Sequence, residues 1–404
     1  MRLTPSESMI LHGIGDLSRW YQDEIYINRP GKFCWWTSRI QILKNHVQLY
    51  VSHHTRTLLA SSDSALRAPF PYSFHLSRIL LPFQPEPTLK PAADFNAAED
   101  GVALRTAMKG FGTDEQAIID ILTARSNEQR QRISNFFTQE YGRNLIEDLK
   151  SELGGHFEDV IVALMIPPVD YMAKQLHKAM DGIGTEEETL VEILCSRDNR
   201  EIAEIVEAYE RLYDRPLAEH LCSETSGDFR RLLTLIVTNC IKQGVRNGNN
   251  DVHPERARES AEMLYNAGEA KLGTDEEIFN KILAHECFAQ LRLIFEEYKS
   301  ISGRTIEQAL RDEISGELKD AMLAIVECVQ SPPAFFAKRL RKAMEGAGTD
   351  DMTLIRIIVS RAEIDLGNIK REYERLYDKT LESSVKKETS GDYKRALVAL
   401  IGGP

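Results

Sequence analysis

The sequence lacks the features that would place it across a membrane or among disulfide-bonded or zinc-binding proteins. No apolar run approaches the ~20 residues that span a bilayer; one of the longest, Leu232 to Val237, is interrupted by Thr234. The six cysteines form no Cys-x-x-Cys pair and no Cys/His zinc spacing; they are Cys34, Cys195, Cys222, Cys240, Cys287 and Cys328. Neither zinc nor disulfides are expected to organise the fold, and a reducing compartment is favoured.

The sequence also lacks an excess of positive charge. It has 50 lysines and arginines against 62 aspartates and glutamates, a net charge of −12. Nucleic acids and acidic lipids attract basic surfaces. Nucleic acid is therefore not an expected partner, and an anionic partner would need a cation between it and this protein. The first residues contain no apolar stretch of signal-peptide length and no cleavage-like site, so we expect a cytosolic location.

Residues 1–82 differ in composition from the rest of the chain. They contain all three tryptophans and five of the ten histidines, with nine basic against five acidic residues. No helical period is sustained there, so we predict a largely disordered N-terminal extension over residues 1–97, with a proline-rich end. The acid-poor stretch 29–62 leaves a transit peptide open, although Glu7 and Asp16 argue against it. No motif in the extension identifies a protein partner.

From about residue 98 the chain repeats one pattern four times. The segments GFGTDEQAIIDIL, GIGTEEETLVEIL, KLGTDEEIFNKIL and GAGTDDMTLIRII begin at residues 110, 182, 271 and 346. Their threonines lie 72, 89 and 75 residues apart, which indicates four repeats of about 70 residues. The predicted repeats are 98–165, 166–238, 256–328 and 329–402, and a turn-rich linker over 239–255 separates the second from the third.

Each repeat has the pattern of α-helices. Apolar residues follow the threonine at helical spacing, as at Ile118, Ile119 and Leu122. A Gln or Glu stands three residues after the threonine in the first three repeats, which predicts a capping box with the threonine beginning the helix. Strand-like runs are absent after residue 82, so the predicted fold class is all-α.

A second shared pattern carries one glutamate in each repeat. Every repeat has a glutamate 40 residues after a loop glycine; the glutamates are Glu152, Glu224, Glu313 and Glu388. A glycine three residues after each glutamate again predicts the end of a helix. One such acid is an ordinary solvated residue, but four copies in the same register indicate a common chemical role.

Calcium binding fits these residue types. The C-terminus of a helix leaves carbonyl groups unpaired at the negative end of its dipole, and glycines let a loop turn those oxygens outward. Ca²⁺ accepts about six to eight oxygen ligands, and three loop carbonyls with a bidentate carboxylate would supply five of them. The remaining positions suit water or a lipid phosphate, which would let an acidic protein approach an acidic membrane.

Other site types do not match the sequence. No Gly-x4-Gly-Lys-Ser/Thr segment indicates a nucleotide-binding loop, and no Asp-x-Asp-x-Asp-Gly segment indicates an EF-hand. The histidines after residue 97 neither recur in register nor pair with a nucleophile; they are His156, His177, His220, His253 and His285. We interpret them as ordinary surface or core residues, and the chain is not predicted to be an enzyme.

The segments KGFGTD, SELGG and ETSGD, with their fourfold repetition over about 98–402, closely resemble the annexins. The resemblance implies four repeats of about five helices each in a curved disc. It also implies Ca²⁺ sites on the membrane-facing side, in the loops between helices one and two and between helices four and five. Carried over by position, the ligands would be the loop carbonyls with one glutamate per repeat: Met108, Gly110, Gly112 and Glu152; Met180, Gly182, Gly184 and Glu224; Gly268, Lys271, Gly273 and Glu313; Met344, Gly346, Gly348 and Glu388.

The third repeat departs from the common loop pattern with AGEAKLGT, and Lys109 before the first loop glycine is replaced by Asp181 and Glu345 in the second and fourth repeats. These acids are expected to weaken attraction to lipid phosphate locally. The residues at the loop apices are Phe111, Ile183, Leu272 and Ala347. The sequence favours neither insertion of these side chains into a membrane nor packing on the loop.

The residues and the resemblance together predict calcium-dependent, reversible binding to acidic, phosphatidylserine-like membranes, in membrane organisation or trafficking. The protein would be cytoplasmic and become peripheral on membranes when calcium rises, where self-association is compatible with the family. Two alternatives remain open at this point. One is an all-α protein-interaction scaffold whose loops are only turns. The other is an ion-conducting assembly at the membrane, although no apolar span supports it.

Overall fold

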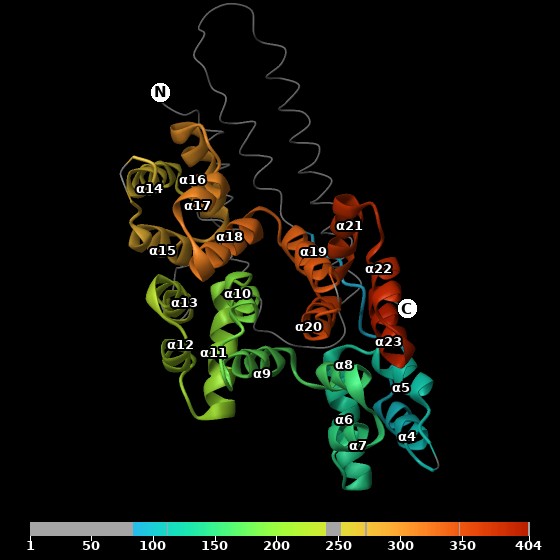
Figure 1. Ribbon diagram of the computed structural model, residues 1–404. Helices are drawn as coiled ribbons and strands as arrows, with labels where there is room; N and C mark the ends of the chain where they lie inside the picture. The colour runs from blue at the N-terminus through green and yellow to red at the C-terminus, as the bar shows by residue number, and fades with distance from the viewer. Residues whose placement is uncertain (1–83, 111, 240–251, 271–272, 347, 403–404) are drawn as a thin grey trace, which may run out of the picture. The chain divides into compact units, whose positions relative to one another are not determined.

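The computed structural model describes residues 84–110, 112–239, 252–270, 273–346 and 348–402. These residues form twenty helices and no strand (Figure 1), which confirms the predicted all-α class. The predicted extension, up to residue 83, and most of the predicted linker 239–255 lie outside the described residues.

The helices fall into four consecutive sets of five, as predicted. The first set comprises α4 (Ala97–Ala107), α5 (Glu115–Leu122), α6 (Asn127–Tyr141), α7 (Leu145–Glu152) and α8 (Gly155–Met165). The second comprises α9 (Pro168–Met180), α10 (Glu187–Cys195), α11 (Asn199–Tyr213), α12 (Leu217–Glu224) and α13 (Gly227–Asn239). The third comprises α14 (Pro254–Ala267), α15 (Glu276–His285), α16 (Phe288–Ser302), α17 (Ile306–Glu313) and α18 (Gly316–Gln330). The fourth comprises α19 (Pro332–Ala343), α20 (Asp351–Ala362), α21 (Leu366–Tyr377), α22 (Leu381–Glu388) and α23 (Gly391–Gly402).

The first and third helices of each set pack against each other and form the centre of the repeat. In every repeat the third helix carries a fully buried aromatic ring four residues before its last residue. These rings are Phe137, Tyr209, Tyr298 and Tyr373. Burial of such rings is among the largest apolar contributions that a single side chain makes to folding. The fourth helix follows after a short turn and ends with the glutamate that the sequence singled out.

The repeats do not pack in the order in which they follow along the chain. Helix α8 of the first repeat contacts α20 and α23 of the fourth, while α13 of the second contacts α15 and α18 of the third. In Figure 1 the cyan and red helices accordingly lie together, as do the green and yellow-orange ones. The first repeat is thus paired with the last, and the two middle repeats are paired with each other.

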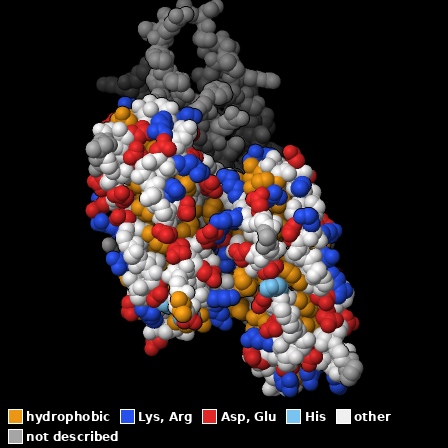
Figure 2. Space-filling view, in the orientation of Figure 1, with side chains coloured by type: hydrophobic (Ala, Val, Ile, Leu, Met, Phe, Trp, Pro, Cys, Tyr) orange, Lys and Arg blue, Asp and Glu red, His pale blue; other side chains and the backbone are white. Residues whose placement is uncertain are grey.

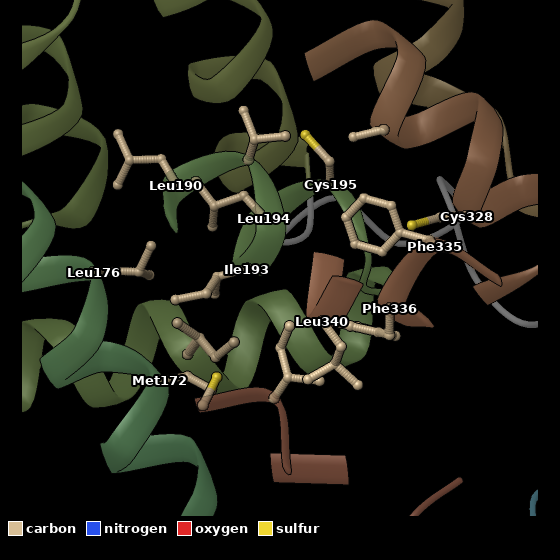
Figure 3. Packing of buried hydrophobic residues seen from close by; sticks show 14 of the residues in the cluster. Met172, Leu176, Leu190, Ile193, Leu194, Cys195, Cys328, Phe335, Phe336 and Leu340 are labelled. Carbon is tan, nitrogen blue, oxygen red and sulfur yellow. The ribbon is translucent and has the colours of Figure 1, made fainter. Parts of the chain in front are cut away.

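Apolar side chains join these pairs into one buried cluster. Figure 3 shows part of it, which includes Leu176 of α9, Ile193 of α10, and Phe336 and Leu340 of α19. A buried ion pair crosses between the second and fourth repeats close by, with Nε of Arg356 2.7 Å from Oε1 of Glu192. Because the two side chains are 2% and 4% exposed, the Arg356 charge depends on Glu192 for its compensation, while Glu192 also lies 3.4 Å from Nη2 of Arg339.

The segment 84–95 connects the fourth repeat to the first. The Gly367 N–H donates to the carbonyl of Glu86 at 2.8 Å, and a Cβ at Gly367 would lie only 2.7 Å from that oxygen, so glycine permits this approach. Farther along, the side-chain amide of Gln129 exchanges two hydrogen bonds with the backbone of Ala92. The end of the predicted extension, from residue 84, is therefore hydrogen-bonded to the helical repeats rather than lying free of them.

Candidate calcium sites

The loop between the first and second helices is closed by the same hydrogen bond in all four repeats. The Asp114 N–H donates to the carbonyl of Ala107 at 2.9 Å. Equivalent bonds of 2.8 Å close the other loops, from Glu186 to Ala179, from Asp275 to Ala267 and from Asp350 to Ala343. The four loops therefore share one closure, even though the third is longer by one residue.

The loop glycines have a backbone conformation that other residues rarely adopt. Gly110 and Gly112 have φ values of 116° and 94°, and open space surrounds the position of a Cβ at each. Backbone conformation rather than crowding therefore selects glycine here. No N–H group among the described residues donates to the carbonyl oxygens of these two glycines. Their oxygens are thus available to a hard cation, and this donor set suits Ca²⁺.

The corresponding glycines of the second and fourth repeats share this left-handed geometry, as does Gly273 in the third; they are Gly182, Gly184, Gly346 and Gly348. Gly268 differs, because it caps α14 with φ −119° and ψ −97°. Lys271, which the resemblance placed among the ligands, lies outside the described residues. Met108 and Met344 are the C-caps of α4 and α19, and Met180 is the last residue of α9.

Each candidate glutamate is the last residue of the fourth helix of its repeat. The glycine three residues later was predicted to mark a helix end, but it is the first residue of the fifth helix. Gly155, for example, has φ 59°. Only two residues separate α7 from α8, so the chain needs a left-handed residue at that point to turn into the new helix.

The capping-box prediction was wrong, because the N-cap of the helix is the residue after the threonine. Asp114 is the N-cap of α5 and accepts a hydrogen bond from the Ala117 N–H at 3.0 Å. The Thr113 hydroxyl instead donates to Oε2 of Glu152 at 3.0 Å. The aspartate carboxylate supplies the cap, so the threonine is free to connect the two loops of the candidate site.

In the third repeat the Thr274 hydroxyl also donates to a carboxylate, Oε2 of Glu313 at 3.0 Å, and it lies 3.3 Å from the backbone carbonyl oxygen of the same residue. These bonds join residues that lie 39 positions apart in the sequence. The first and third repeats thus bring the glycine loop and the glutamate together through a direct side-chain contact.

The second and fourth repeats hold their carboxylates differently. The Thr185 hydroxyl donates to the backbone carbonyl of Glu224 at 3.0 Å and not to its carboxylate. Oε1 of Glu224 accepts a hydrogen bond from Ser223 Oγ at 3.1 Å and lies 3.9 Å from Nε2 of His220. In the fourth repeat, Oε1 of Glu388 accepts a hydrogen bond from Nζ of Lys387 at 2.8 Å.

Sequence reasoning passed over the surroundings of His220. Its Nδ1 lies 2.5 Å from the hydroxyl oxygen of Tyr209, which lies 3.0 Å from Nδ1 of His177. Burial, followed by the nearby Arg215 charge, lowers the pKa of His220 below its ordinary value. The available signal was the position of His220, one helical turn before Glu224 on α12.

Ile183, at the apex of the second loop, is fully exposed and therefore does not pack on the loop. The other three apex residues lie outside the described part of the chain. Figure 2 shows acidic and basic side chains intermixed over the visible face, which offers no broad basic field to an anionic surface. In the part of the chain that the structure describes, no helix is both long enough and apolar enough to span a bilayer.

Comparison with known proteins identifies the origin of this repeated geometry. A family model described as Annexin matches residues 99–164, 171–236, 259–325 and 335–400. The chain belongs to the annexin family. This annexin is 65% identical to Annexin B10 of Drosophila melanogaster over 322 residues, which are 79% of this chain and 99% of that relative.

Solved structures agree with the family assignment. Annexin III has a TM-score of 0.76 and 44% identity, covering 79% of this annexin and 97% of that chain. A calcium-bound annexin (Sm)1 has a TM-score of 0.69 and 32% identity, covering 79% of this annexin and 94% of that chain. The predicted four-repeat annexin fold is thereby confirmed, and a protein with the same fold has been solved with calcium bound.

Proposed function

We propose that this annexin binds acidic phospholipid membranes reversibly and only in the presence of calcium. The observation that carries the proposal is the contact between the two loops of one repeat. The Thr113–Glu152 bond joins a carboxylate to a loop whose two glycine carbonyls accept no hydrogen bond from the described residues. A hard cation that prefers oxygen ligands is the species that this arrangement suits.

The proposed ligands are loop carbonyl oxygens and one carboxylate in each repeat. They are Met108, Gly110, Gly112 and Glu152; Met180, Gly182, Gly184 and Glu224; Gly268, Lys271, Gly273 and Glu313; and Met344, Gly346, Gly348 and Glu388. When bound, calcium would supply the positive charge that lets a lipid phosphate complete the coordination shell. The loop residues would direct their carbonyl oxygens toward the ion and the glutamate would add its carboxylate, which would leave the remaining ligand positions for water or a lipid phosphate.

The charge of the molecule supports a requirement for the cation. A protein of net charge −12 with intermixed surface charges is repelled by an acidic membrane on average. Binding is therefore expected to disappear in a chelator. We further propose that the protein acts in membrane organisation or trafficking without enzymatic activity. It would be cytoplasmic at low calcium and peripheral on membranes, where copies could associate, at high calcium.

Sedimentation with phosphatidylserine-containing vesicles tests this function. The full chain is expected to sediment with vesicles in calcium, to remain in the supernatant in chelator, and to ignore phosphatidylcholine vesicles. Replacing the four candidate ligands together, Glu152→Gln, Glu224→Gln, Glu313→Gln and Glu388→Gln, is expected to abolish sedimentation. Vesicle binding that persists in chelator, or that survives this fourfold replacement, would contradict the proposal.

A matched control keeps the change in charge constant. Four exposed glutamates on the third helices are replaced together: Glu140→Gln, Glu210→Gln, Glu296→Gln and Glu374→Gln. This control removes the same number of acids but no candidate ligand, so it is expected to bind vesicles like the parent. If neither the parent nor the control bound calcium with or without lipid, the protein-interaction scaffold would replace membrane binding as the better explanation.

A further inference from the structure

The second repeat differs from the others around the buried aromatic ring of its third helix. Tyr209 of α11 occupies the place of Phe137 in α6 and of Tyr298 in α16. The Tyr298 hydroxyl has no hydrogen-bond partner among the described residues. The Tyr209 hydroxyl, by contrast, lies between two imidazoles, those of His177 on α9 and His220 on α12. One tyrosine thus connects three of the five helices of this repeat.

The geometry of this connection extends to the candidate calcium ligand. His177 stacks on Tyr213, with ring centroids 3.7 Å apart and planes 15° apart, which fixes its orientation. From His177 the contacts run through the Tyr209 oxygen to Nδ1 of His220, and Nε2 of His220 lies 3.9 Å from Oε1 of Glu224. The carboxylate therefore lies at the end of an ordered series of polar groups.

The number of hydrogens available at the Tyr209 hydroxyl determines the tautomers of His177 and His220. A phenol has one hydrogen to donate, and two Nδ1 atoms face it, so one Nδ1 accepts from the hydroxyl and the other donates to it. If Nδ1 of His220 accepts, its Nε2 carries the ring hydrogen, and Nε2 is the atom that lies 3.9 Å from Oε1 of Glu224. The opposite assignment would direct a lone pair at a negative charge. Electrostatics therefore selects the first arrangement, in which His177 donates to Tyr209 and Tyr209 donates to His220.

The second repeat needs such a group because its threonine is used elsewhere. In the first and third repeats the loop threonine donates to the carboxylate itself. Thr185 donates to the backbone oxygen of Glu224 and leaves the carboxylate to other partners. Ser223, the adjacent residue, contacts the same oxygen, but its hydroxyl also donates to the carbonyl of His220, so its single hydrogen is shared.

We propose that His220, held in position by Tyr209 and His177, is the positioning residue that orients the Glu224 carboxylate for calcium in the second repeat. The inference rests on the proposed function, since it concerns one of the four proposed sites. It assigns to histidines of one repeat the role that the loop threonine has in the first and third. His220 does not itself bind the ion; it directs the carboxylate that does.

The test uses the full chain with only the second site intact, carrying Glu152→Gln, Glu313→Gln and Glu388→Gln. Calcium binding in the presence of phosphatidylserine vesicles is measured by titration calorimetry. His220→Leu in this background is expected to weaken calcium binding about tenfold, the scale of losing a group that orients a metal ligand. His220→Gln, whose amide nitrogen takes the place of Nε2, is expected to restore most of the loss.

Two hydroxyl deletions form the matched pair. Tyr209→Phe removes the link to His177 and is expected to weaken calcium binding by less than His220→Leu does. Tyr298→Phe removes the equivalent hydroxyl of the third repeat and is expected to have no effect. Circular dichroism verifies that each variant is folded. Unchanged binding in His220→Leu, or a folded His220→Gln that binds as poorly as His220→Leu, would overturn the proposal, as would absence of calcium binding in the parent background.

Imidazole ¹⁵N spectra of the wild-type chain separate this inference from the proposed function. Calcium is expected to shift the ring signals of His220 and His177 but not that of His285, and Glu224→Gln is expected to remove the shifts. Vesicle sedimentation that remains calcium-dependent while the His220 signal stays unmoved would refute the positioning role alone. If the wild-type chain did not bind vesicles in calcium, the proposed function would be refuted as well.

Discussion

The first and second repeats have the same backbone plan but hold their glutamates by different means. In the first, a threonine hydroxyl bonds to the carboxylate directly; in the second, the threonine bonds to the backbone and a histidine faces the carboxylate. The loop closure and the glycine conformations are alike in both. The two repeats therefore share the backbone geometry of the loop, whereas the side chains that contact the glutamate carboxylate differ.

The largest expected effect comes from removing the carboxylates in pairs. We expect Glu152→Gln with Glu313→Gln to raise the calcium concentration for half-maximal vesicle sedimentation at least about tenfold, or ~1.4 kcal/mol. Glu224→Gln with Glu388→Gln should raise it less, because the loop threonines do not hold those carboxylates. Equal increases in the calcium requirement for the two pairs would show that the difference in threonine contacts does not matter for binding.

Removing the threonine hydroxyls is expected to have the next largest effect. A hydrogen bond to a charged group contributes about 1.5–3 kcal/mol at most, so Thr113→Val with Thr274→Val should weaken calcium binding several-fold in calorimetric titrations with vesicles. Thr185→Val should have a smaller effect, because its partner is a neutral carbonyl. A larger loss of calcium affinity from Thr185→Val than from Thr113→Val or Thr274→Val made singly would contradict this assignment.

A smaller effect is expected from the residue before the first loop glycine. Lys109→Gln should weaken and Asp181→Asn should strengthen binding to phosphatidylserine vesicles, each by about 1 kcal/mol or about fivefold, because single charges near an acidic surface have that value. Both shifts should shrink as salt rises from 0.05 to 0.5 M, on account of screening. Shifts that do not depend on salt would exclude a simple charge effect.

The smallest effect is expected in the fourth repeat. Lys387 pairs with Glu388 while being largely exposed, and such surface pairs contribute about 0–1 kcal/mol. The lysine competes with calcium for the carboxylate. In a chain in which only the fourth site remains, Lys387→Gln should therefore lower the calcium concentration needed for binding, by less than about threefold. Calorimetry with vesicles measures this change, and a tenfold change would mean that the lysine belongs to the site.

Much of the fold could be predicted from the sequence because the helices repeat in register. The apolar period around Ile118 and Leu122 indicates the helix. The constant spacing from the loop glycine to Glu152 associates the acid with the glycine loop. The threonine was misassigned because a capping box and a loop-connecting hydroxyl have the same local sequence. Only the positions of Asp114 and Glu152 in space decide between them.

The contacts of His220 could not be predicted in the same way. They depend on side chains from three helices, and the positions equivalent to His220 hold Asp148, Ala309 and Ser384 in the other repeats. A search for features common to all four repeats discards such a group. A property confined to one repeat is visible only when the helices are in place.

The pairing of the first repeat with the last has a consequence for biosynthesis. Helix α8 is made early, but it buries its apolar face against α20 and α23, which are made last. The two middle repeats meet as soon as the third has left the ribosome, whereas the first must wait for nearly the whole chain. Distant partners delay folding and leave apolar surface exposed. The first repeat is therefore the part of the nascent chain that we expect to depend most on chaperones.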